Sequence, residues 1–76
     1  MSDLARLSDP RPWIDQIFSA KSAAAGGVVR RSVAHVVREI GRETLELEVR
    51  RRGYHLIESD GQFIIICNAK PLQVIC

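Results

Sequence analysis

The chain of 76 residues has few aromatic side chains, few lysines and no long apolar run. No segment approaches the roughly 20 consecutive apolar residues of a membrane-spanning helix. The opening stretch MSDLARLSD lacks the basic and apolar regions of a signal peptide. We therefore expect a cytoplasmic protein without a membrane partner.

The composition is that of a folded globular protein, with 46% hydrophobic and 26% charged residues. A chain of this length buries only about 60% of its unfolded surface, so its core is thin and a second copy helps to stabilise it. The net charge of +2 is too small to indicate a polyanionic partner, although nine of the eleven basic residues are arginine. We predict a flexible N-terminus over residues 1–8 and one domain over residues 9–76.

Residues 53–76 contain the clearest structural signals. Asp60 and Gly61 lie between two apolar runs and predict a two-residue type I′ hairpin, since that turn needs positive φ at both central residues. Residues 68–71 predict a second reversal, after which residues 72–76 return as a third strand. These signals indicate a three-stranded antiparallel meander.

The turn also fixes which side chains share a face, because a two-residue loop places Ser59 opposite Gln62 and side chains alternate along a strand. One face collects Tyr54, Leu56, Phe63, Ile65, Cys67, Leu72, Val74 and Cys76. The other face collects His55, Ile57, Ile64, Ile66, Gln73 and Ile75. The middle strand is apolar on both sides, which is typical of a strand buried on both faces.

Cysteine is scarce, with two residues. In this register Cys67 and Cys76 are about four residues apart along neighbouring strands, or roughly 13 Å, whereas a disulfide needs Cα atoms within about 7 Å. Two thiols without histidines beside them are too few for a zinc site. We expect two reduced, buried thiols and neither metal nor cofactor.

Upstream, apolar residues at helical spacing predict helices. The first begins after a proline-containing entry at residues 9–12, carries Trp13 and Ile17 on its apolar side, and ends at the glycine pair 26–27. Residues 28–31 are short and β-prone. A second helix over residues 33–40 has Ser32 before it as a good N-cap, but the sequence leaves the next segment ambiguous.

Residues 42–52 fit either a strand or a helix. Glutamates precede arginines, which complements the helix dipole, and Glu46→Arg50 and Glu48→Arg52 have favourable i,i+4 spacing. We predict a helix. The fold class is then α+β, with about three helices packed on a three-stranded antiparallel β-meander in the order α-(β)-α-α-β-β-β.

Four stretches carry a resemblance: GGVVRRS (26–32), EIGRE (39–43), EVRRRGYHLIE (48–58) and QFIIICN (62–68). They resemble a family of small bacterial proteins without known function, some of which carry the name N-(5′-phosphoribosyl)anthranilate isomerase. The resemblance covers about residues 12–76. That isomerase is a (β/α)₈ barrel of about 200 residues or more, which this length cannot form. The resemblance therefore implies no catalytic residues.

The order helix, short strand, helix, glycine turn, helix, hairpin is also that of a winged helix-turn-helix. Residues 33–40 and 43–52 are then the motif, and Asp60-Gly61 is the wing. Arginines that could touch phosphates are Arg30, Arg31, Arg42, Arg50, Arg51 and Arg52. Three observations oppose this interpretation. The second of these helices begins with three glutamates, the wing contains no basic residue, and an additional strand follows the hairpin.

Isolated polar residues indicate structure rather than catalysis. His35 is predicted on the solvent side of its helix, beside Glu39. His55 and Glu58 fall on opposite sheet faces and cannot form an acid–base pair there, while Cys67 has no base on its face. The glycine pair 26–27 lacks the lysine and the glycine spacing of a phosphate-binding loop. We expect no enzyme.

The second face of the predicted sheet suggests a function. Ile57, Ile64, Ile66 and Ile75 form an apolar patch too contiguous for a soluble monomer. Either the first helix wraps round to cover it, or a second copy packs against it, sheet on sheet. We predict a homodimer and a non-catalytic interaction or oligomerisation protein. The alternative is a winged-helix-like nucleic-acid-binding protein.

Overall fold

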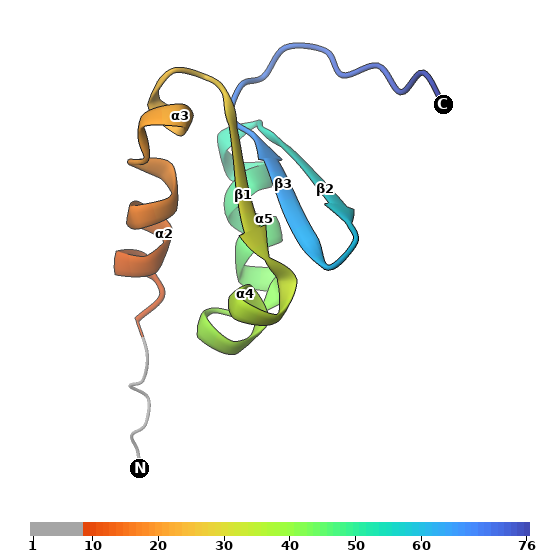
Figure 1. The fold of residues 1–76 in the computed structure, drawn as a ribbon. Helices are drawn as coiled ribbons and strands as arrows, with labels where there is room; N and C mark the ends of the chain where they lie inside the picture. Colours follow the sequence, from red (N-terminus) through yellow and green to blue (C-terminus); the bar gives the residue numbers. More distant parts are fainter. Residues whose placement is uncertain (1–8) are drawn as a thin grey trace.

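The structure is a computed structural model that describes residues 9–76 (Figure 1). The segment predicted to be flexible, residues 1–8, lies outside the described residues. The described elements are α2 (Arg11–Phe18), α3 (Lys21–Ala24), β1 (Val28–Ser32), α4 (Val33–Glu39), α5 (Arg42–Arg52), β2 (His55–Ser59) and β3 (Gln62–Ile66). The predicted α+β class with a three-stranded antiparallel sheet is confirmed.

The hairpin forms in the predicted register. Asp60 and Gly61 have φ values of 52° and 72°, as a type I′ turn requires. β2 pairs antiparallel with β3, with Ser59 opposite Gln62 and each preceding residue opposite the next residue of β3. The turn chemistry alone therefore determines which side chains of these two strands share a face.

The third strand is β1, which corrects the prediction that residues 72–76 return to the sheet. β1 pairs antiparallel with β3, with Val29 opposite Ile65, and the strand order is β1-β3-β2. Because β3 has a partner on each side, it has no edge left for the C-terminal segment. The Asn68 side chain also donates a hydrogen bond to the Gly26 carbonyl at 2.9 Å, which leads the chain away from the sheet.

The first helical segment is two helices rather than one. Between α2 and α3, Ala20 has an extended backbone with φ −58° and ψ 148°. The helix predicted to continue to the glycine pair 26–27 is therefore interrupted at Ala20, and Ala23 of α3 is buried in the core. Alanine side chains bury little area, so they contribute too little to keep the helix continuous against the turn into β1.

α4 and α5 form where they are expected, and their ends show why. Ser32 Oγ accepts a hydrogen bond from the His35 backbone N–H at 3.3 Å and caps α4. Gly41 separates the two helices with φ 85°, and Gly53 ends α5 in the left-handed conformation. The helical prediction for residues 42–52 is confirmed.

All helices that reach the core lie on one side of the sheet. Trp13 of α2 packs edge-on against His35 of α4, and Phe18 of α2 packs beside Tyr54. α5 lies behind the sheet in the view of Figure 1. The core contains Ile17, Ala23, Val29, Val36, Leu45, Val49, Phe63, Ile65 and Cys67. Within residues 9–76, the first helix does not wrap round to the opposite face.

Candidate interaction surface

The sheet face directed away from the helices, here called the open face, carries a cluster of apolar side chains at the end of the sheet away from the hairpin turn. Side chains alternate across each strand, so the observed pairing places β1, β3 and β2 residues in rows on this face. Its apolar members are Val28, Ile57, Ile64 and Ile66. Ile57 is 36% exposed, and Ile64 and Ile66 are only partly buried. A contiguous apolar patch of this kind is typical of an interaction site.

Three of the four predicted interface residues, Ile57, Ile64 and Ile66, lie together on the open face. The predicted position of Ile75 on that face is wrong: it is 79% exposed in the C-terminal segment. Val28 occupies the corresponding place. Sequence reasoning missed Val28 because residues 28–31 were not placed in the sheet, although their β-branched residues were a signal for a strand.

Residues 71–76 are here called the C-terminal arm, and the residues just before them are held in place by hydrogen bonds. The Cys67 N–H donates to the Gly27 carbonyl at 2.8 Å, and the Lys70 N–H donates to Asn68 Oδ1 at 3.0 Å. The His55 ring nitrogen Nε2 lies 2.6 Å from the Lys70 carbonyl oxygen. These contacts hold the start of the arm beside the first residue of β2.

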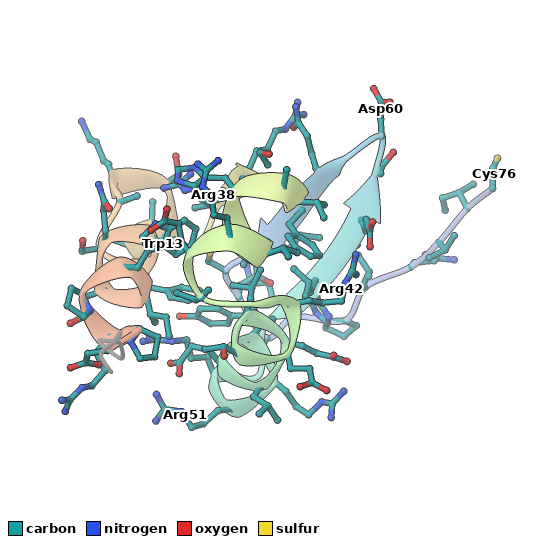
Figure 2. All side chains as sticks on the ribbon, turned by 90° about the horizontal axis from the view of Figure 1, so that it is seen from below. Trp13, Arg38, Arg42, Arg51, Asp60 and Cys76 are labelled. Carbon is teal, nitrogen blue, oxygen red and sulfur yellow. The ribbon has the colours of Figure 1, made fainter. Side chains whose placement is uncertain are left out.

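The arm itself is extended and exposes its apolar side chains. Leu72 is exposed, and Val74 is 76% exposed. Figure 2 shows Cys76 at the outer end of the arm, away from the helices. Three apolar residues in sequence positions 72–75 therefore lie outside the core, which makes the arm a second candidate contact surface.

A pocket of about 250 Å³ lies between α5 and the start of β2. Val49, Tyr54 and Leu56 supply its apolar lining, and Glu46 and Arg50 lie at its wall. Those two side chains form an ion pair at 3.1 Å. The pocket is thus apolar inside, and the charges of Glu46 and Arg50 at its wall cancel each other. The sequence did not predict it, because it depends on how α5 packs against β2.

The two cysteines have different surroundings. Cys67 is buried and Cys76 is exposed, and neither forms a disulfide. Burial raises the pKa of the Cys67 thiol, an effect opposed by the positive charge of Arg52. The prediction of two buried thiols is right for Cys67 and wrong for Cys76, because the arm is not a strand of this sheet.

Arg42 contacts both a carboxylate and an aromatic ring. It donates to both carboxylate oxygens of Glu58, at 2.6 Å and 3.2 Å, and its guanidinium carbon lies 5.1 Å from the centroid of the Phe63 ring. The hydrogen bond from Arg42 lowers the pKa of Glu58, and the same bond raises the pKa of Arg42. Arg42 thus joins the start of α5 to the end of β2.

The three arginines at the end of α5 are also paired. Arg50 contacts Glu46, while Arg51 and Arg52 contact the same Glu48 oxygen at 2.6 Å and 2.7 Å. Together with Arg42, four of the six candidate phosphate contacts have glutamate partners. Of these pairs, Glu46–Arg50 and Glu48–Arg52 are the ones that the charge order of the helix predicted.

The two arginines of β1 differ from these four. Arg30 lies on the open face beside Ile64, and the Arg31 side chain donates to the Arg30 carbonyl at 2.7 Å. Among residues 9–76, neither guanidinium forms an ion pair with a carboxylate. The six arginines therefore do not converge as one unpaired basic surface.

The order of the elements agrees with the winged helix-turn-helix interpretation, whereas the charge at the hairpin tip opposes it. The predicted strand 72–76, which opposed this interpretation, does not form: in the described chain no strand follows the hairpin. Asp60 lies at the tip of the hairpin, where a wing would meet nucleic acid (Figure 2). An acidic tip repels phosphate, so the element order alone supports this function.

The histidines have structural contacts. The His35 ring lies edge-on to Trp13, and its Nε2 is 4.0 Å from a Glu39 oxygen. His55 and Glu58 lie on opposite sheet faces, as predicted. Residues 9–76 contain no cluster of three or more His, Cys, Asp or Glu that could hold a metal ion. Over the same range, no helix has the length and apolar character to cross a bilayer.

The fold places the chain among α+β proteins with a three-stranded antiparallel sheet. Comparisons with protein-family models, with curated proteins and with solved structures give no match to it. The resemblance carried by the four sequence stretches above stays a prediction. The functional argument therefore rests on the surfaces of this molecule.

Proposed function

We propose that this chain is a non-catalytic interaction protein of the cytoplasm that forms a homodimer through its open face. The observation that carries the proposal is the apolar patch of Val28, Ile57, Ile64 and Ile66 on a sheet whose helices, among residues 9–76, pack on the other side. Burying such a patch is favourable by about 25 cal/mol per Å² of apolar area. Two free thiols also suit a reducing compartment.

A second copy is the partner that best matches this face. The patch is self-complementary in chemistry, and in a two-fold dimer the same face packs against itself. Two such sheets stack with their strands within about 30° of each other. Arg30 lies beside Ile64 on the edge strand β1, and its long side chain can extend past the contact to keep the charge in water.

The test compares two substitutions to glutamate on the same face of the same hairpin. Ile64→Glu places a charge in the centre of the patch and is expected to give a folded monomer. Ser59→Glu, near the hairpin tip and away from the patch, is the matched control and is expected to remain dimeric. Light scattering measures mass and circular dichroism measures folding. Equal masses for both variants and the wild type contradict the proposal.

Nucleic-acid binding is the second candidate, favoured by the order of the elements from α2 to β3. A fluorescence titration with duplex DNA and with RNA at two salt concentrations tests it. Arginine contacts to phosphates predict micromolar or tighter affinity that weakens steeply with salt. Because four arginines are paired with glutamates, we expect the measured affinity to be weaker than micromolar, which contradicts this second candidate.

A further inference from the structure

The C-terminal arm has the composition of a strand but no strand partner. Leu72, Val74 and Ile75 are apolar or β-branched and exposed. Within the described chain, residues 71–76 make no hydrogen bond. In an extended conformation, Leu72 and Val74 lie on one side and Gln73 and Ile75 on the other. The arm is therefore an extended segment with a strand-like sequence, and among residues 9–76 nothing pairs with it.

β2 offers the complementary partner. It is an edge strand of the sheet, so its outer row of backbone N–H and C=O groups has no neighbouring strand. The pocket lined by Val49, Tyr54 and Leu56 lies beside this edge, on the helix side. A strand added along β2 directs alternate side chains into that pocket, which is how added strands acquire affinity and selectivity.

The root of the arm determines where it leads. Hydrogen bonds at Asn68 and Lys70 fix its start, and the His55 contact places it beside the first residue of β2. Figure 1 shows the arm passing the β2 side of the sheet and running away from the molecule. An arm held in this direction is available to a neighbouring copy.

We infer that residues 72–76 of a second copy add to β2 as a fourth strand, so that two copies exchange their arms. The inference rests on the proposed homodimer. In the antiparallel register that places Val74 of the partner opposite Leu56, Val74 enters the pocket between α5 and β2. Leu72 then lies opposite Glu58, and Ile75 falls on the open-face side, opposite His55. Ile75 then contributes to the interface from the partner chain rather than from its own sheet.

The symmetry of the proposed dimer permits the exchange. A two-fold axis between the open faces and perpendicular to the strands brings the two β2 edges to the same side with opposite directions. Each arm starts at the Tyr54 end of its own β2 and runs antiparallel to the β2 of the partner.

The first experiment measures the dimer dissociation constant by sedimentation equilibrium for two variants of the full chain. Val74→Glu places a charge in the pocket and is expected to weaken dimerisation about tenfold or more. Gln16→Glu adds the same charge at an exposed position of α2, away from the arm and the open face, and is expected to change the constant by less than about threefold. Equal constants for the two variants overturn the arm exchange.

The second experiment identifies the chain that supplies the arm. In a mixture of isotope-labelled and unlabelled wild-type protein, filtered NMR spectra are expected to show contacts between Val74 methyl groups and the Tyr54 ring across chains. The same contacts within one chain, persisting in a monomer, overturn the exchange. If Ile64→Glu disrupts the dimer but Val74→Glu does not, only the arm exchange is contradicted. If the wild type is a monomer at every concentration, the homodimer is contradicted as well.

Discussion

The guanidinium of Arg52 lies over the Phe18 ring, with its central carbon 4.2 Å from the ring centroid. The same side chain donates through Nε to Glu48 at 2.7 Å. Arg52 therefore links α2 to α5 by a cation–π contact and an ion pair. It is the arginine of the α5 terminus whose surroundings differ most from solvent, because its side chain is 31% exposed.

We expect Arg52→Ala to lower the free energy of unfolding by about 1–2 kcal/mol, since it removes the ring contact and one partner of a nearly buried carboxylate. Arg50→Ala removes only the exposed pair with Glu46 and should cost less than about 0.5 kcal/mol. Urea denaturation compares the two. Equal losses show that the Phe18 contact contributes nothing.

Glu48 gives the protein a pH dependence. Burial raises the pKa of its carboxyl, but hydrogen bonds from Arg51 and Arg52 outweigh burial and hold the pKa below the ordinary 4.5. A folded pKa below the unfolded one means that this group stabilises the fold above about pH 4.5 and loses that contribution as pH falls through the folded pKa.

We therefore expect Glu48→Gln to destabilise the protein at pH 7 by on the order of 1 kcal/mol and to have little effect near pH 3. Thermal melting of wild type and variant across this range measures the difference. Glu43→Gln, in the first turn of the same helix, is the control and should show a smaller pH-dependent difference. A difference for Glu48→Gln that is constant with pH contradicts the assignment.

Adjacent valines of α4 test the position of the core. Val36 is fully buried and Val37 is half exposed. Val36→Ala leaves a cavity in the core and should cost about 2 kcal/mol or more, whereas Val37→Ala should change stability by less than about 0.5 kcal/mol. Chemical denaturation decides between them. The reverse order means that α4 presents its other side to the sheet.

The hairpin turn gives a prediction about the backbone alone. A Cβ at Gly61 meets no atom within 4 Å, but φ is +72° there. Gly61→Ala should therefore cost about 1 kcal/mol from conformational strain without any steric clash. Asp60→Gly, at the other positive-φ position, should cost less or stabilise slightly. A neutral Gly61→Ala in thermal melts excludes the type I′ turn.

Local signals were enough to predict much of this fold. The type I′ turn set the register of β2 and β3, the Ser32 cap set the start of α4, and the charge order of residues 42–52 selected a helix. Each of these depends on residues within a few positions of one another. The placement of Ile57, Ile64 and Ile66 on one face follows from the turn and was predicted with it.

Long-range pairing was not predicted, and the reason is physical. Residues 28–32 and 72–76 are both β-prone, and either could occupy the free side of β3. The choice depends on tertiary contacts such as the Asn68 side chain bonding to the Gly26 carbonyl. The positions of Val28 and Ile75, and the pocket beside Tyr54, follow from that choice and could not be read from local patterns.

Sedimentation equilibrium of the wild-type chain, over a range from about 5 to 500 µM, tests the central claim most directly. The open face predicts a mass that rises with concentration from one chain to two and stops there, because a two-fold contact is closed. A mass of one chain throughout this range contradicts the account, since the apolar open face then needs no second copy.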